Sequence, residues 1–189
     1  MKDPKDHLAQ TLKQVRKDKK LSLDRAADLT GVSKAMLGQI ERGESSPTVS
    51  TLWKIATGFE VSLSSFIEPT TSQNLKKPVV RTADEIRQHP AEGGLMIAPL
   101  FPYESQLGFE YLELVFQAGY DRESAAHAPG VIEIVTVLSG VLEICCEGIW
   151  HKLEEGQSLR FAGDKPHAYR NATGEDAKVI TVIHYPNGR

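Results

Sequence analysis

The chain has 189 residues, of which 40% are hydrophobic and 25% are charged, and its formal net charge at pH 7 is −3. These values are typical of a soluble globular protein with one or two domains, and they exclude a strongly basic protein that binds nucleic acid along its whole surface. No apolar run approaches the length of about 18 residues that a membrane-spanning helix needs. The polar N-terminus MKDPKDHLAQ also lacks the apolar core of a signal peptide. We therefore expect a cytoplasmic protein that does not enter the membrane.

Positive charge is concentrated near the N-terminus. Residues 1–68 carry 11 Lys and Arg against 9 Asp and Glu, and the first 20 residues carry seven basic and three acidic groups. The rest of the chain has a net charge of −5. A mildly basic head on an acidic body is compatible with DNA binding by the head alone.

Apolar residues recur at helical spacing from residue 8 to residue 67, which predicts a bundle of five helices. Leu8, Leu12 and Val15 form the stripe of the first helix. SSPTVSTLWKIATGF predicts the fourth, and VSLSSFI predicts a last short turn. We expect the buried stripe of the fourth helix to contain Leu52, Trp53, Ile55 and Ala56.

Two short helices joined by a tight turn lie between these segments. We expect Ser22 to cap a helix that runs to Leu29 and ends at Gly31. Ser33 then caps a second helix, which Gly43 terminates. This is the arrangement of a helix-turn-helix, whose second helix enters the major groove of DNA. The core side of that helix is predicted to hold Met36, Leu37 and Ile40, and the outward side Ser33, Lys34, Ala35, Gly38 and Gln39.

The outward side chains suit contacts with base edges. Gln39 could bond to adenine in a bidentate manner, Lys34 could reach guanine, and the methyl group of Ala35 could contact thymine. The alternative is a helical bundle without a ligand, in which Ser33 is only a cap.

The segment from Ser22 to Ile67, SLDRAADLTGVSKAMLGQIERGESSPTVSTLWKIATGFEVSLSSFI, resembles the DNA-binding domain of the Cro/cI repressor class, also called the XRE family. The resemblance covers residues 8–68. It implies base contacts from the second helix and phosphate contacts from the loop that follows. The implied base-contacting residues are Ser33, Lys34, Ala35 and Gln39, and the implied phosphate-contacting residues are Arg42, Ser46 and Thr48, with Lys13 and Arg16 as further candidates.

The pattern changes after residue 68. Residues 69–78 are predicted to form a linker, and ADEIRQH (83–89) a small helix. The remaining apolar runs are strand-like and separated by turn signals, which predicts a sandwich or a barrel. These runs are LMIAPLF, GFEYLELVFQAG, VIEIVTVLSG, VLEICCEGIW, QSLRFAG and AKVITVIHY. We therefore expect a DNA-binding domain over residues 8–68, the linker over 69–78 and an all-β domain over 79–189.

Two segments of the β half resemble the motifs of the cupin barrels. HAPGVIEIVTVLSG is similar to the first motif, and GQSLRFAGDKPHAYRN is similar to the second, although Ala162 and Asp164 depart from its usual residues. The resemblance implies a cupin β-barrel over about residues 100–186. The matching positions are His127, Glu133 and Gly140 in the first motif, and Gly156, His167 and Asn171 in the second.

The cupin resemblance implies a pocket formed by His127, Glu133 and His167. Such a set can hold a divalent metal such as Fe, Mn, Ni or Zn. The full cupin set has a second histidine in the first motif, and this sequence has Pro129 or Ala125 there, depending on the register. A three-ligand metal site stays open, because open sites need only three protein ligands. The alternatives are a metal-free pocket for a small molecule and a purely structural barrel.

The combination of the two domains resembles bacterial one-component transcription regulators. That resemblance implies a head that reads an operator, a barrel that binds a small-molecule effector of unknown identity, and a homodimer. Two recognition helices about 34 Å apart then predict a roughly palindromic site in double-stranded DNA. The competing hypothesis is a metal-dependent cupin enzyme, an oxygenase or an isomerase, fused to a DNA-binding head. The missing histidine argues against it, so we expect no enzyme.

The two cysteines of the chain, Cys145 and Cys146, are adjacent. Neighbouring side chains of a strand point to opposite faces, so a bridge between them would be strained. A disulfide framework is therefore excluded, in agreement with a reducing compartment. We expect one buried thiol and one on the other face, and a redox sensor is the alternative.

Overall fold

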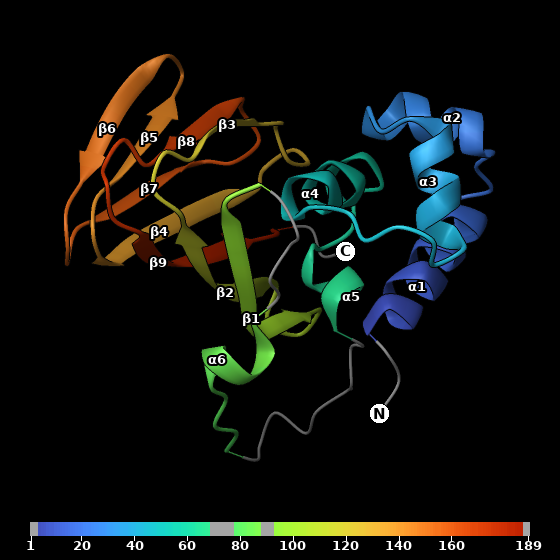
Figure 1. Ribbon diagram of the computed structural model, residues 1–189, viewed down its shortest axis with the longest axis horizontal. Coiled ribbons are helices and arrows are strands. Elements are labelled where there is room, and N and C mark those ends of the chain that lie inside the picture. Colours follow the sequence, from blue (N-terminus) through green and yellow to red (C-terminus); the bar gives the residue numbers. More distant parts are fainter. Residues whose placement is uncertain (1–3, 69–77, 88–92, 187–189) are drawn as a thin grey trace.

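The computed structural model describes residues 4–68, 78–87 and 93–186 of the chain. A helical domain at the N-terminus lies beside a C-terminal β-barrel, as Figure 1 shows. The predicted linker, apart from Pro78, lies outside the described residues, as does the end of the small helix predicted at 83–89. The helices are α1 (Pro4–Asp18), α2 (Leu23–Thr30), α3 (Lys34–Glu41), α4 (Val49–Gly58), α5 (Ser64–Ile67) and α6 (Ala83–Ile86).

The turn between α2 and α3 has the predicted geometry. The Ser22 hydroxyl accepts a hydrogen bond from the backbone N–H of Arg25 at the start of α2. Gly31 ends α2 with a φ of 65°, a left-handed conformation that glycine adopts without steric cost. The Ser33 hydroxyl then accepts from the N–H of Met36 and starts α3. The helix-turn-helix is therefore confirmed.

The prediction for the inner face of α3 was wrong at two positions. Leu37 and Ile40 are each 1% exposed, as expected, but Met36 is 37% exposed and Gly38 is buried. A Cβ at Gly38 would lie 3.1 Å from the Arg42 guanidinium and would also contact α2, so a small residue lets these groups approach α3. The buried stripe is thus narrower than the sequence pattern indicates, and Met36 lies beside it.

The β half forms two sheets that pack face to face, consistent with the predicted cupin barrel. One sheet has the order β1-β2-β9-β4-β7 and the other has the order β3-β8-β5-β6. All the pairs are antiparallel. The strands are β1 (Leu95–Glu104), β2 (Phe109–Phe116), β3 (Asp121–Ser124), β4 (Ile132–Ser139), β5 (Leu142–Cys146), β6 (Ile149–Leu153), β7 (Ser158–Ala162), β8 (His167–Arg170) and β9 (Ala177–His184).

The run VLEICCEGIW is a hairpin rather than one strand. It turns between β5 and β6 at Glu147 and Gly148, whose φ values of 50° and 83° are those of a tight two-residue hairpin turn. The expectation for the cysteines was also wrong, because Cys145 and Cys146 are both half-buried. Burial raises the pKa of the Cys146 thiol to about 11, so this thiol stays protonated at neutral pH.

The helical domain packs on the barrel through α4 and α5, whereas α2 and α3 lie on the side away from it (Figure 1). At α5 the backbone N–H of Ser64 donates to Glu110 Oε2 at 3.1 Å, and the N–H of Tyr103 donates to the Ser64 hydroxyl at 2.9 Å. The Tyr185 hydroxyl donates to Glu110 Oε1. The buried Glu110 carboxylate therefore links the two domains. In the described part of the chain, no helix has the length and apolar character to cross a membrane.

Candidate functional site

The outward face of α3 presents small and polar side chains to solvent. Lys34, Ala35 and Gln39 are exposed. Ser33 is exposed as well, although its hydroxyl is engaged in the helix cap. The Lys34 ammonium lies 2.8 Å from an Asp24 carboxylate oxygen, and both side chains are more than half exposed. Such a surface pair is weak, so the ammonium can exchange this partner for another anion or for a base edge.

The loop after α3 carries three of the residues expected to contact phosphates. Arg42 forms an exposed ion pair with Glu44, with its Nη2 atom 2.7 Å from Oε2. Ser46 is exposed. Thr48 is half-buried, because its hydroxyl caps α4 by accepting from the N–H of Thr51. Arg42 and Ser46 are thus exposed at the end of α3, and the surface pair of Arg42 can exchange Glu44 for another anion, while Thr48 also has a structural role.

The two candidates on α1 differ in their surroundings. Lys13 is exposed. The Arg16 side chain is only 15% exposed, and its guanidinium binds both carboxylate oxygens of Glu41 at 2.5 and 2.8 Å. It also donates to the backbone oxygen of Leu21. The donors of Arg16 therefore hold α1 against the end of α3, which positions α3 in the helical domain.

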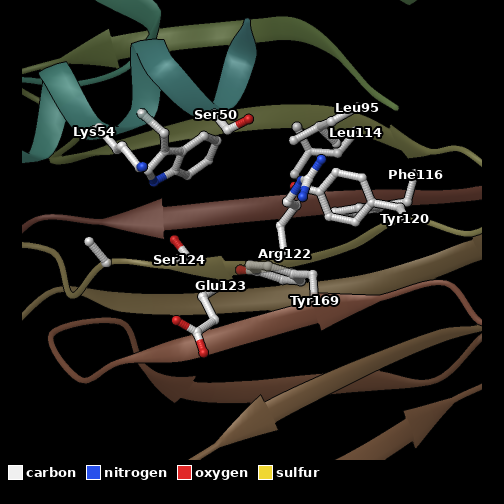
Figure 2. Close-up of a pocket in the computed structure, with 12 residues that line it drawn as sticks. Ser50, Lys54, Leu95, Leu114, Phe116, Tyr120, Arg122, Glu123, Ser124 and Tyr169 are labelled. Atoms are coloured by element: carbon white, nitrogen blue, oxygen red, sulfur yellow. The ribbon is translucent and has the colours of Figure 1, made fainter. Parts of the chain in front are cut away.

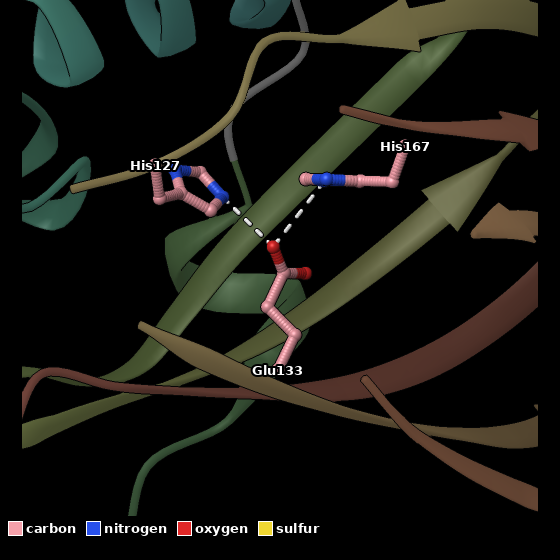
Figure 3. A group of neighbouring side chains, drawn as sticks. All are labelled: His127, Glu133 and His167. Carbon is pink, nitrogen blue, oxygen red and sulfur yellow. Dashed lines mark ion pairs between the residues drawn. The ribbon is translucent and has the colours of Figure 1, made fainter. Parts of the chain in front are cut away.

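The barrel brings His127, Glu133 and His167 together in its interior, as Figure 3 shows. Glu133 lies on β4, His167 lies on β8, and His127 lies in the loop between β3 and β4. One carboxylate oxygen, Glu133 Oε1, is 2.8 Å from His127 Nε2 and 3.4 Å from His167 Nε2. All three side chains are buried. The predicted pocket residues thus form one compact cluster.

A backbone carbonyl determines which ring nitrogen of His167 carries a proton. His167 Nδ1 lies 2.8 Å from the backbone oxygen of Lys165, and since a carbonyl only accepts, Nδ1 must carry the proton. In the neutral ring, the lone pair of His167 Nε2 then faces Glu133 Oε1 at 3.4 Å, and this nitrogen is buried without a hydrogen bond. Two facing acceptors call for a cation between them, either a proton on His167 Nε2 or a metal ion. The donor set of two imidazoles and a carboxylate therefore fits a divalent metal ion.

Glu133 is kept ionised by its partners. Burial acts to raise the pKa of its carboxyl group, but the hydrogen bond and charge of His127, the charge of His167 and the hydrogen bond from Tyr169 lower it further than burial raises it. The Tyr169 hydroxyl donates to Glu133 Oε2 at 2.6 Å. Gly163 makes room for the cluster, because a Cβ there would lie 3.1 Å from Glu133 Oε1 and 3.2 Å from His127 Cδ2.

The helical domain contacts this cluster directly. The Trp53 indole N–H donates to His127 Nε2 at 3.3 Å, and the Thr57 hydroxyl lies 3.4 Å from His127 Nδ1. The indole and imidazole ring centres are 5.7 Å apart. His127 Nε2 accepts from Trp53 only when it is unprotonated, and it donates to Glu133 only when it is protonated. A metal ion on Nε2 would need the same lone pair that accepts the indole N–H.

Sequence reasoning missed this role of Trp53, which it placed in the core of the helical domain. The signal was present in the spacing of Ser50, Trp53, Lys54 and Thr57, which is the i, i+3, i+4, i+7 pattern of one helix face. This second face of α4 meets the barrel, while a different face is buried within the helical domain. The residues on that inner face are Val49, Leu52, Ile55 and Ala56.

A cavity lies where α4 meets the barrel, and Figure 2 shows the side chains around it. Its cavity volume is about 50 Å³, within about 540 Å³ of empty space that includes open solvent. Tyr169 lies in its wall and also bonds to Glu133, so the cavity adjoins the His–Glu–His cluster. Ala125, one of the two positions at which a second cupin histidine would stand, also lines it. The lining residues are Ser50, Trp53, Lys54, Leu95, Leu114, Phe116, Tyr120, Arg122, Glu123, Ser124, Ala125 and Tyr169.

A helix-turn-helix domain followed by a cupin barrel defines a class of DNA-binding transcription regulators, and comparison with known proteins places the chain in it. The helix-turn-helix family matches residues 12–66, and the cupin domain family matches residues 112–183. The HTH-type transcriptional regulator SutR of Escherichia coli (strain K12) is 47% identical over 179 residues, which cover 95% of each chain. The chain therefore belongs to the family of HTH-type transcriptional regulators with a cupin domain.

Two further comparisons agree with this assignment. The HTH-type transcriptional regulator PuuR of Escherichia coli (strain K12) is 26% identical over 175 residues, which cover 93% of this chain and 92% of PuuR. The crystal structure of an HTH_3 family transcriptional regulator from Vibrio cholerae superposes with a TM-score of 0.80 at 43% identity, over 96% of this chain and 97% of that one. These relatives are regulators rather than enzymes, which decides against the fused cupin enzyme.

Proposed function

We propose that this regulator reads a specific DNA site with α3 and that its barrel senses a small-molecule effector. The observation that carries the first part is the exposed outward face of α3, which is held rigidly by the buried Leu37 and Ile40. Major-groove recognition requires a helix anchored on one side and free on the other. The proposed base-contacting residues are Ser33, Lys34, Ala35 and Gln39.

Phosphate contacts are proposed around the end of α3. Arg42 and Ser46 are exposed there, Thr48 lies at the start of α4, and Lys13 is exposed on α1. Phosphate contacts fix the orientation of the protein on the duplex without reading its sequence. We assign Arg16 a positioning role instead, because Glu41 and Leu21 already occupy its donors.

We also propose that the regulator acts as a homodimer that binds a roughly palindromic site. The outer face of β4 exposes Ile132, Ile134 and Leu138, with exposed fractions of 39%, 39% and 43%. A row of aliphatic side chains on a sheet face is typical of a surface that another sheet covers. A second copy of the chain would cover this face and would bring two recognition helices to successive turns of the major groove.

Effector sensing is assigned to the barrel, with His127, Glu133 and His167 at its centre. Two imidazoles and a carboxylate would hold a divalent metal, which would supply a positive charge inside the barrel. The contact between Trp53 of α4 and His127 of the barrel supports communication between the domains. An effector can change DNA affinity only if it favours one arrangement of the heads over another.

Genome-wide mapping of the sites occupied by the full-length protein tests this function. We expect sites built from two half-sites related by a two-fold axis and separated by about one helical turn.

Ile134→Lys places a charge on the proposed dimer face and should give a monomer whose operator affinity falls by about a hundredfold or more, because the second head is lost.

Ile149→Lys is the matched control for the dimer, because Ile149 lies on the other sheet and is already 63% exposed. This variant should stay dimeric in sedimentation experiments and should bind DNA like the wild type. An Ile134→Lys protein with unchanged mass and operator affinity would refute the dimer face. Scattered, sequence-independent occupancy of the genome would refute the proposed function itself.

A further inference from the structure

The cavity between α4 and the barrel takes its walls from both domains. Ser50, Trp53 and Lys54 come from the DNA-binding domain, and Arg122 and Tyr169 come from two strands of the barrel. A molecule bound in this space would therefore contact the DNA-binding domain itself. The cavity therefore lies between the barrel and the DNA-binding domain.

The charges at the cavity are mainly positive. Within the part of the chain that the structure describes, neither Lys54 nor Arg122 forms an ion pair. Figure 2 shows the Arg122 side chain rising from β3 into the space bordered by Leu114 and Tyr169, whereas Glu123, the next residue of the strand, points the opposite way. This opposite orientation follows from the alternation of side chains along a strand. The cavity thus offers two cationic groups, one from each domain.

The rest of the wall is apolar or aromatic. Leu95, Leu114 and Phe116 provide buried hydrocarbon surface, and Tyr120 and Tyr169 add aromatic rings. Burial raises the pKa of Tyr120 to about 12, although the charge of Arg122 acts to lower it, so its hydroxyl stays neutral at physiological pH. Pockets of this kind bind an apolar body by burial and use a few polar groups to fix its orientation.

We infer that the effector is a small organic anion with an apolar body, held in this cavity by Lys54 of α4 and Arg122 of β3. Its carboxylate or other anionic group binds between the two cations, and its apolar part packs against the aromatic wall. Because each domain supplies one of the cations, the ligand ties α4 to the barrel and favours one position of the heads. The inference rests on the proposed regulatory function to this extent.

Matched pairs of probes with the same body and opposite charge test the ligand class. The chain has two tryptophans, so in the Trp150→Phe background the emission reports on Trp53 alone. Phenylacetate and hexanoate should change this emission in a saturable way at millimolar concentrations or below, whereas phenethylamine and hexylamine should not. Arg122→Gln and Lys54→Met should each weaken anion binding roughly tenfold or more, the loss expected for one charge-assisted hydrogen bond.

Lys152→Met is the control, because Lys152 is an exposed cation on β6 that lies outside the cavity lining and pairs with Glu154, so its loss should leave anion affinity unchanged. Amines that bind as well as the acids would overturn the inference. So would acids that bind Arg122→Gln and Lys54→Met as tightly as the wild type, or that show no saturable effect.

Operator binding by the same proteins tests the regulatory function separately from the ligand class. Wild-type protein that binds its genomic sites but none of the anions refutes the ligand class and leaves the regulator intact. Protein that binds the anions through Lys54 and Arg122 but recognises no DNA site refutes the proposed regulatory function and leaves the cavity's ligand class standing.

Discussion

Helices α3 and α4 begin in the same way, but their outer faces have different surroundings. Each starts at a hydroxyl cap, Ser33 or Thr48, and each buries one face in the core of the helical domain. The remaining face of α3 is exposed, whereas the remaining face of α4 lies against the barrel. The comparison shows how a small domain divides two tasks. One helix is left uncovered for an external partner, and its neighbour connects that domain to the rest of the protein.

The largest expected effect is a loss of stability on substitution of a residue on the inner face of α3. Leu37 is 1% exposed, and Leu37→Ala should lower the free energy of unfolding by about 2–5 kcal/mol, because it leaves a cavity under the recognition helix. Met36 is its neighbour on the same helix and is 37% exposed. Met36→Ala should change stability by no more than about 0.5 kcal/mol.

Urea denaturation of the full-length variants, followed by circular dichroism at helical wavelengths, measures both values. The pair distinguishes the observed narrow stripe from the wider one that the sequence predicts. If Met36→Ala cost as much stability as Leu37→Ala, then Met36 would belong to the core after all.

The next largest effect is expected on the outer face of α3, where a substitution should weaken DNA binding rather than stability. Gln39 is exposed, so Gln39→Ala should leave the fold intact and cost about 1–3 kcal/mol of binding free energy on the cognate site. Base preference at one position of each half-site should relax. Fluorescence anisotropy with operator fragments substituted at single positions measures both effects. Unchanged specificity would remove Gln39 from the base-contacting set.

The sequence predicts the helical domain well because its signals are local. Ser22, Gly31 and Ser33 act on their immediate neighbours, so a cap or a left-handed turn can be recognised without knowledge of the tertiary structure. The cupin cluster was predicted by family resemblance, and the fold does gather its three side chains. The sequence pattern did not predict strands β3 and β8, because each has only four residues and no clear alternation of apolar and polar side chains.

The interdomain contacts could not be predicted in the same way. Trp53 reads as a core residue because its position fits an apolar stripe, and nothing in the sequence specifies that the barrel covers the other side of α4. Arg122 and Lys54 are 68 positions apart and meet the same cavity only through the packing of the domains. Periodicity defines the faces of a helix, whereas tertiary packing decides what each face contacts.

The smallest of these effects is expected on substitution of a residue on the barrel-facing side of α4, where stability should fall only slightly. Trp53→Phe keeps an aromatic ring against the barrel but removes the N–H that donates to His127. The lost hydrogen bond should lower the free energy of unfolding by about 1 kcal/mol, and less if His127 Nε2 then donates fully to Glu133. Base preference should not change, because this side chain faces the barrel. Urea denaturation and the operator panel used for Gln39→Ala measure the two quantities.

Trp150→Phe is the matched control for this substitution. Trp150 lies on the other sheet, where its ring stacks on the Arg170 guanidinium at 4.1 Å, far from α4 in the fold. A stability loss in Trp53→Phe that exceeds the loss in Trp150→Phe would assign the difference to the bond between the domains. A relaxed base preference in Trp53→Phe would contradict the division of labour between the two helices, because a barrel-facing side chain would then influence which bases α3 reads.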